Sequence, residues 1–200
     1  MIISGEEIIK YGILKGGLRE DSLTNKPNIN IIAVQPNSVD IRLCGVFETV
    51  ELPLGEKIHR SELKEVKTVP IGTGEYYKLQ YNSYYLFKTP IIDLRSTSDF
   101  WKYQKVCIIN DDNNVAQYCE KYNFCGEVII KSSWALRGWQ MFPNHWDTGF
   151  NDSGFVLIKT PDKPIDSMTN YIYVHKNSYF AQLRVYVSSP TGNYVKNMGV

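Results

Sequence analysis

Much of the chain alternates between apolar and polar positions with the period of two that half-buried strands show. In the clearest case Val39, Ile41 and Leu43 alternate with Asp40 and Arg42. Later segments are rich in Tyr, Val, Ile and Phe, and turn-forming Gly, Pro, Asn and Asp separate them. The strands predicted in this way are Glu75–Leu79, Tyr84–Lys88, Gly126–Lys131, Gly154–Lys159, Asn170–His175 and Tyr179–Val187.

Two segments have helical spacing instead. The first begins with Ser4 and Glu7, a capping-box pair in which each side chain can bond the other residue's backbone N–H. Its apolar stripe is Ile8, Ile9, Ile13 and Leu14, and Gly16-Gly17 ends it. The second segment, Asn113–Tyr122, has the spacing 0, 3, 4 and 7 that predicts an amphipathic helix. The residues at these positions are Val115, Tyr118, Cys119 and Tyr122.

The predicted architecture is therefore mainly β, with many short strands and two helices. At 200 residues the chain fits one domain, spanning residues 1–200. Many short strands separated by turns favour a barrel or a double-sheet jelly roll. We expect residues 89–124 to be an insertion within this domain that bears the second helix.

The composition excludes several classes of protein and partner. Lys and Arg number 22 and Asp and Glu number 21, a net charge of +1, so neither nucleic acid nor an anionic membrane is expected as a partner. No window approaches the ~18 apolar residues of a membrane span, and the N-terminus lacks the pattern of a signal peptide. These features predict a cytoplasmic protein.

Cysteine spacing and motif searches exclude further chemistry. The four cysteines, Cys44, Cys107, Cys119 and Cys125, form no C-x-x-C pair, which predicts reduced thiols and no zinc site. Zinc nucleotide deaminases carry H-x-E with P-C-x-x-C, and the chain has neither. It also lacks the P-loop, dinucleotide-binding and G-x-S-x-G motifs. Any deamination would therefore proceed without a metal at the base.

One candidate site follows a strand that ends in basic and hydroxyl residues. Lys131, Ser132 and Ser133 come directly after that strand, and Arg137 follows one turn later. Positive charge, hydroxyls and adjacent backbone N–H groups are what a phosphate needs. The alternative is an ordinary helix start that Ser132 or Ser133 caps.

A second candidate is the turn His145–Phe150. Asp147 could align or deprotonate a water molecule, Phe150 could stack on a ligand, and His145 could hydrogen-bond or change its charge near neutral pH. The alternatives are a hairpin turn of the Asp-x-Gly type and a structural histidine.

Two strands carry polar pairs on a single face. Asp40 and Arg42 form one pair, and Gln182 and Arg184 form the other. Each pair fits either a solvated or ion-paired strand face or part of a site.

Taken in order, these segments resemble the dCTP deaminase and dUTPase superfamily, and most closely its dCTP deaminase branch. Residues 35–43 are similar to that branch's Q-P-x-S-V-D-L-R-L segment, and residues 131–138 to its R-S-S-L-A-R-L-G phosphate segment. The turn at residues 145–150 is similar to H-R-I-D-P-G followed by an aromatic residue. Further similarity lies at residues 2–9, 15–18 and 179–183, whereas residues 89–124 have no counterpart.

The resemblance implies a dUTPase-like distorted jelly roll or β-barrel that assembles as a homotrimer. It also implies active sites between subunits that take a deoxynucleoside triphosphate with Mg²⁺. It assigns Asp147 and Ser132 to catalysis, and Asp40 to a structural position or one near the metal. It assigns to nucleotide binding Lys131, Ser133, Arg137, His145, Phe150 and Gln182.

Three positions depart from the family pattern. Lys131 replaces the family arginine, so that a bidentate donor becomes a point charge. Arg137 lies one place later than the motif's second arginine. The strand after the Asp147 turn lacks the family's proton-shuttling glutamate, because Leu157, Ile158 or Lys159 takes its place.

Two functions remain open. The first is a deoxypyrimidine nucleoside triphosphate enzyme, which either deaminates the base or hydrolyses the triphosphate through a water molecule oriented by Asp147. The second is a catalytically inactive homotrimer used for binding or assembly, for example a regulatory or viral structural protein. A viral protein would lie in the host cytoplasm or in the virion.

Overall fold

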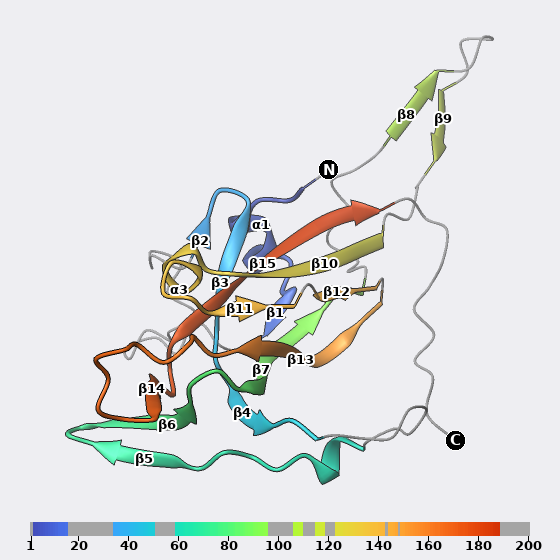
Figure 1. Ribbon diagram of the computed structural model, residues 1–200. Helices are drawn as coiled ribbons and strands as arrows, with labels where there is room; N and C mark the ends of the chain where they lie inside the picture. The colour runs from blue at the N-terminus through green and yellow to red at the C-terminus, as the bar shows by residue number, and fades with distance from the viewer. Residues whose placement is uncertain are drawn as a thin grey trace.

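Two five-stranded antiparallel sheets carry the fold in the computed structural model (Figure 1). The model describes residues 2–15, 34–50, 59–95, 106–109, 115–118, 123–142, 144–147 and 149–188. The first sheet has the order β12 (Asn144–Trp146), β10 (Asn123–Ile130), β15 (Tyr179–Ser188), β3 (Ser38–Arg42) and β2 (Val34–Gln35). The second has the order β1 (Leu14–Lys15), β7 (Tyr84–Asp93), β13 (Asn151–Lys159) and β11 (Gln140–Met141), with β4 (Gly45–Glu48) paired to the first half of β7.

One core joins these two sheets. Val39 and Leu183 of the first sheet and Phe87 and Ile158 of the second are almost fully buried in the same apolar cluster. The rings of Phe87 and Phe180 meet edge to face, with their centroids 5.4 Å apart. Most of β10 and β15 alternates between buried and partly exposed side chains, so polar residues of these strands lie on the face of the first sheet that is turned away from the core.

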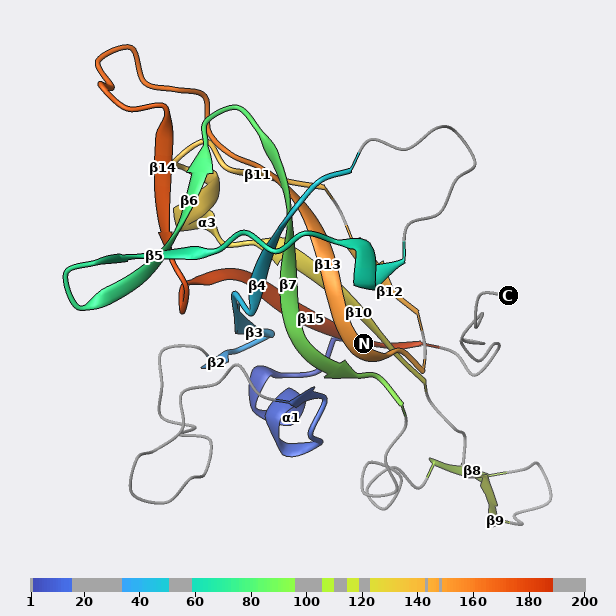
Figure 2. The ribbon, with the colours of Figure 1, turned by 90° about the horizontal axis from the view of Figure 1, so that it is seen from below.

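Two smaller sheets and three short helices complete the described structure. One sheet has the order β14 (Tyr171–His175), β6 (Gly74–Gln80) and β5 (Thr68–Ile71). The other pairs β8 (Val106–Ile109) with β9 (Val115–Tyr118), and it stands away from the other sheets in both Figures 1 and 2. The helices are α1 (Gly5–Lys10), α3 (Ser132–Ala135) and the 3₁₀ helix η1 (Arg60–Glu62).

The predicted N-terminal helix is confirmed, together with its capping box, but it ends at Lys10 rather than at Gly16, because Leu14–Lys15 is strand β1. The Glu7 backbone N–H donates to the Ser4 hydroxyl, and the Ser4 N–H donates to the Glu7 carboxylate at 2.8 Å. Figure 2 shows α1 beside β2 and β3. The approach is close, because a Cβ at Gly5 would lie 2.3 Å from the Gln35 carbonyl oxygen. Only glycine fits at this contact.

The mainly β prediction is confirmed, and each predicted strand segment lies mostly within an observed strand. The predicted helix over Asn113–Tyr122 is wrong where the structure describes it, since Val115–Tyr118 is strand β9. Its residues have antiparallel partners in β8, where Val106 is opposite Tyr118. A local hairpin partner thus outweighs the helical spacing, and the β8 sequence Val-Cys-Ile-Ile favours a strand. Cys119 and Tyr122 lie outside the described residues.

The ends of the predicted insertion belong to the main sheets. β7 continues to Asp93, and β10 already begins at Asn123. Residues 89–93 and 123–124 are therefore sheet strands. The middle of the predicted insertion includes the hairpin β8–β9, and most of its remaining residues lie outside those the structure describes.

Candidate functional site

Several predicted site residues share the polar face of the first sheet. On β10 the side chains of Phe124 and Val128 are buried in the core, so Glu127 lies on the other face, as does Lys131 just beyond the strand. Register places Gln182 between Ile129 of β10 and Asp40 of β3. It also places Glu127 between His145 of β12 and Arg184 of β15.

A buried carboxylate joins three strands at one end of this face. Asp40 is only 2% exposed, and its carboxylate forms an ion pair with the Lys131 ammonium. The Gln182 side-chain amide donates to the other carboxylate oxygen of Asp40 at 3.1 Å. The Asp40 carboxylate is therefore buried with both oxygens bonded, and Lys131 is already paired.

Tyr179 lies beside the same network. The guanidinium carbon of Arg42 is 5.3 Å from the centre of the Tyr179 ring, and the Lys131 ammonium is 5.8 Å from it. Both distances allow a cation–π attraction. The Arg42 Nε and the Tyr179 hydroxyl are buried and have no hydrogen-bond partner among the described residues. The network thus holds donors that lack acceptors.

The helical turn α3 directs two serines to solvent. Lys131 precedes the helix as its N-cap and makes no side-chain cap hydrogen bond, so neither Ser132 nor Ser133 caps the helix start. Both serines are exposed. Within the part of the chain that the structure describes, their backbone N–H groups donate to no acceptor. Two hydroxyls and two N–H groups are therefore available here to an anion.

Trp134 fixes this turn to the core. Its ring centroid lies 4.7 Å from that of Trp139 and 6.2 Å from that of Phe87. Trp139 is 5% exposed and belongs to the buried cluster. Anchoring at Trp134 therefore sets the position of the neighbouring serines. Arg137 is exposed on the turn that follows α3.

Asp147 comes directly after β12 and is exposed. The residue before it, Trp146, is buried and stacks on Phe150 with the ring centroids 5.5 Å apart and the planes 18° from parallel. Gly154 of β13 makes room for Trp146, because a Cβ there would lie 2.3 Å from the indole ring. Phe150 is 8% exposed, so its ring contributes mainly to this packing rather than to an open surface.

The structure does not bring Asp147 and Lys131 together within one chain. Trp146 is opposite Gly126, and Lys131 lies five positions further along the β10 direction. At 3.3 Å per residue the two side chains are separated by roughly 15–20 Å. Asp147 and His145 thus lie at one end of the polar face, and Lys131 and Gln182 lie at the other.

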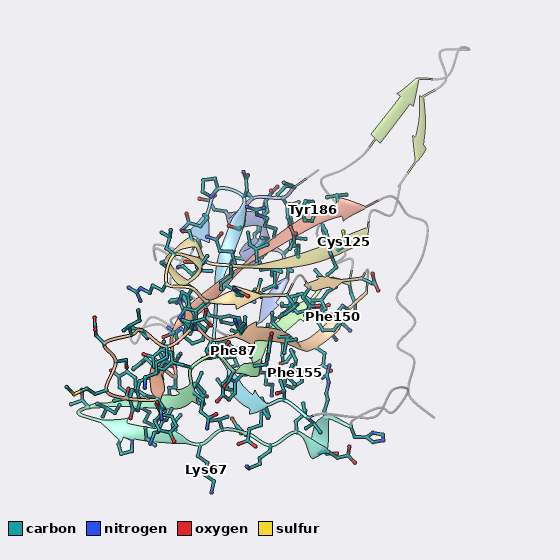
Figure 3. All side chains as sticks on the ribbon, in the orientation of Figure 1. Lys67, Phe87, Cys125, Phe150, Phe155 and Tyr186 are labelled. Carbon is teal, nitrogen blue, oxygen red and sulfur yellow. The ribbon has the colours of Figure 1, made fainter. Side chains whose placement is uncertain are left out.

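Sequence reasoning missed a hydrogen-bonded pair near the Asp147 end. The Tyr186 hydroxyl donates to the Glu127 carboxylate at 2.7 Å, and this hydrogen bond raises the pKa of Tyr186. Burial raises the pKa of the neighbouring Cys125, and the charge of Asp147 acts in the same direction. Figure 3 shows Cys125 and Tyr186 close together at this end of the sheet. The period of two places all of these side chains on one face, which is a signal in the sequence that could have found them.

The strand β13, on which the resemblance places a proton-shuttling glutamate, has no such group in its second half. β13 ends at Lys159, whose ammonium lies 3.3 Å from the Asp162 carboxylate, and the Asp162 side chain is 81% exposed. Ile158 is buried in the core, and Leu157 is apolar. The second half of β13 therefore offers no carboxylate to move a proton.

The described residues do not form a magnesium site of their own. No group of three His, Cys, Asp or Glu side chains among them is placed to hold a metal ion. We call the turn Lys131–Ser133 the serine turn. The Asp40 carboxylate beside it is already bonded to Lys131 and Gln182.

Comparisons with known proteins support the fold class. The two-sheet antiparallel arrangement with a polar sheet face is a dUTPase-like β fold. No protein-family model matches the chain, and no curated protein sequence matches it. Among solved structures, the crystal structure of 2′-deoxycytidine 5′-triphosphate deaminase from Agrobacterium tumefaciens matches with a TM-score of 0.55 and 14% sequence identity.

This match covers nearly the whole of this chain and about half of the Agrobacterium protein. It includes 94% of this chain and 48% of the Agrobacterium protein, so the chain spans about half the length of that deaminase. The likeness establishes the dCTP deaminase-like fold. Among the described residues no helix is long and apolar enough to cross a membrane.

Proposed function

We propose that the chain binds a deoxypyrimidine nucleoside triphosphate at the turn Lys131–Ser133. The observation that carries this proposal is the turn itself, where two exposed serines with unpaired backbone N–H groups follow a strand directly and Trp134 anchors them. These hydroxyl and N–H groups are neutral hydrogen-bond donors that can bind phosphate oxygens without rearrangement of the turn. The fold shared with a dCTP deaminase supports the nucleotide class.

A complete site needs more than one copy of the chain. Asp147 and the serine turn lie near opposite ends of β10, so within one chain they do not meet at the same reacting phosphate. Assembly as a homotrimer, which the resemblance implies, would bring the Asp147 end of one copy to the serine turn of another. Arg137 on the same turn would add positive charge towards the phosphates, which would carry their Mg²⁺.

Between the two reactions, the described residues favour hydrolysis. Deamination needs a group that donates and accepts protons at the base, and the second half of β13 has Lys159 but no carboxylate. Hydrolysis needs a carboxylate to orient water, and Asp147 is exposed and available for that role. The expected products are pyrophosphate and a deoxynucleoside monophosphate.

A second candidate, a catalytically inactive binding or assembly protein, has its own support. Lys131 replaces a bidentate arginine and is paired with the buried Asp40, so it must leave that carboxylate or reach past it to contact phosphate. An ion pair between Lys131 and Asp40 can serve to hold the ends of two strands together without any ligand.

A product assay separates these functions. The purified protein is incubated with dCTP, dUTP and the other deoxynucleoside triphosphates in the presence of Mg²⁺, and the products are resolved by ion-exchange chromatography. We expect pyrophosphate release that Asp147→Asn abolishes while the oligomer persists. Conversion of dCTP to dUTP would contradict the preference for hydrolysis. Unchanged nucleotides from an intact oligomer, together with binding detected by calorimetry, would favour the inactive binding protein.

A further inference from the structure

A corner of the molecule that none of the serine-turn residues lines contains two adjoining cavities. It lies where the β3–β4 connection meets β6 and the β14–β15 turn, segments that come together in Figure 2. The first cavity has a volume of about 320 Å³ and the second about 480 Å³. Tyr77 and Lys176 line both of them. Volumes of this size suit small molecules.

The first cavity is lined by donors and cations. Its lining residues are Arg42, Leu43, Cys44, Tyr77, Lys176 and Asn177. No acidic side chain is among these lining residues, although Glu75 forms an ion pair with Lys176 from the second cavity. The charges of Lys88 and Arg42 also act on Cys44. The lining of the first cavity thus carries positive charge without a carboxylate of its own, while Glu65 and Glu75 lie in the adjoining cavity.

Two of its donors have no acceptor. Tyr77 is only 6% exposed as a whole residue, it lines both cavities, and none of the described residues accepts a hydrogen bond from its hydroxyl. The Arg42 Nε is likewise buried without an acceptor. A buried donor without a partner is costly, and a bound acceptor removes that cost. Burial and the charge of Glu65 together raise the pKa of Tyr77, so the hydroxyl keeps its proton and remains a donor.

We propose that this corner, which we call the Tyr77 cavity, binds the oxyanion group of a small molecule. The phosphate or carboxylate oxygens accept hydrogen bonds from Tyr77 and Arg42, and Lys176 adds charge. The rest of the molecule extends into the second cavity, where Glu65, Lys67 and Thr68 line the wall. None of the residues Lys131–Ser133 lines the Tyr77 cavity, although Arg42 also lies beside the Tyr179 ring near Lys131, and occupation of the cavity does not depend on the proposed nucleotide function.

Cys44 provides a direct readout, because its thiol lines the cavity and is accessible at the surface. The full-length protein is treated with iodoacetamide at increasing concentrations of inorganic phosphate, and alkylation of Cys44 is followed by peptide mass spectrometry. Cys125, which does not line the cavity, is the internal standard. Sodium chloride at equal ionic strength controls for screening, and acetate in a parallel series distinguishes carboxylate from phosphate binding.

We expect saturable protection of Cys44 by phosphate, acetate or both, with half-protection on the order of millimolar. Tyr77→Phe removes one hydrogen bond to an anion, and it should raise the half-protection concentration about tenfold. Lys176→Gln should weaken protection in the same direction. Tyr173→Phe, an exposed tyrosine that does not line the cavity, is the matched control and should leave protection unchanged.

Protection that does not saturate, or that sodium chloride reproduces, would overturn the proposal. Equal protection in the wild type, Tyr77→Phe and Lys176→Gln would also overturn it, because the anion would then be bound elsewhere. Binding detected by calorimetry without protection of Cys44 would place the anion outside the cavity, at the serine turn for example.

Discussion

Asp40 shows how far a single residue can be interpreted from its sequence neighbours. Its alternation with Val39 and Ile41 predicts a strand position away from the core, and the alternatives were a solvated or an ion-paired face. The structure shows an ion pair with Lys131 whose carboxylate is almost fully buried, since Asp40 is only 2% exposed. The partner Lys131 is 91 residues away in the chain, and no local pattern specifies a contact at that separation.

The pairing of Asp40 with Lys131 gives a prediction for stability. Lys131→Gln leaves the buried Asp40 carboxylate without its counter-charge and should lower the free energy of unfolding by about 1–3 kcal/mol. Asp40→Asn should restore part of this loss in the double variant, because the charge that lacks a partner is then gone. Urea unfolding of the two single variants and the double variant measures the coupling. Additive losses would show that the two side chains do not interact in solution.

At the scale of elements, strand patterns were more reliable than helical spacing. Strands in the core, such as β7, β13 and β15, carry β-branched and aromatic residues whose alternation was visible. The segment Val115–Tyr118 has the spacing of a helix, yet it pairs with β8. Pairing with a neighbouring strand outweighs a periodic signal as short as this one. At α3 the sequence does not distinguish a phosphate-binding turn from a helix start that a serine caps. The position of this turn depends on the contacts of Trp134 with Trp139 and with Phe87, which is distant in the sequence.

The contact between β12 and β13 should be sensitive to one methyl group. Gly154→Ala places a Cβ against the Trp146 ring, and the resulting displacement should cost about 1–3 kcal/mol of stability. Ser153→Ala, one residue earlier, is the control and should change stability by less than about 0.5 kcal/mol. Thermal unfolding and tryptophan fluorescence follow the two variants. A Gly154→Ala protein with wild-type stability would show that Trp146 moves aside without cost.

The same substitution should also affect the Asp147 turn. Trp146 immediately precedes Asp147, so moving its ring moves the turn. We expect Gly154→Ala to reduce nucleotide turnover more than it reduces nucleotide binding. This is because the serine turn at the other end of β10 has its own anchor in Trp134.

At the scale of the whole molecule, the separation of Asp147 from the serine turn can be tested by mixing variants. Ser133→Ala and Asp147→Asn should each inactivate a site that needs both residues. If the two residues come from different copies, subunits that are unfolded and reassembled together should form some sites that carry neither change. Random assembly of equal amounts would restore about a quarter of the sites. A mixture with no activity beyond that of the separate variants would contradict a site shared between copies.

Stability should also fall in alkaline solution. The pKa values of Cys44 and Tyr77 are raised, chiefly because the partial burial of each group disfavours its charged form. Unfolding lowers these pKa values to about 9.0 and 10.0, so the unfolded chain loses its protons first. The stabilisation is therefore complete below about pH 9 and is lost as the pH rises through the folded-state values.

Thermal unfolding at about pH 8 and about pH 10.5 checks this alkaline effect. The melting temperature of the wild type should fall between the two conditions. A variant that combines Cys44→Ser with Tyr77→Phe should fall less, since it lacks both titrating groups. Equal decreases in the two proteins would assign the alkaline loss to other residues.

The pairing of β3 with β15 also affects how the chain can fold as it is made. Asp40 and Gln182 are hydrogen-bonded across 142 residues, so β3 leaves the ribosome long before its neighbour in the sheet exists. At ordinary rates of translation this delay is on the order of ten seconds. During that time Val39 and Ile41 have no sheet to cover them, and contacts this distant in sequence form slowly. The nascent chain should therefore need shielding by chaperones until β15 has been synthesised and can close the first sheet.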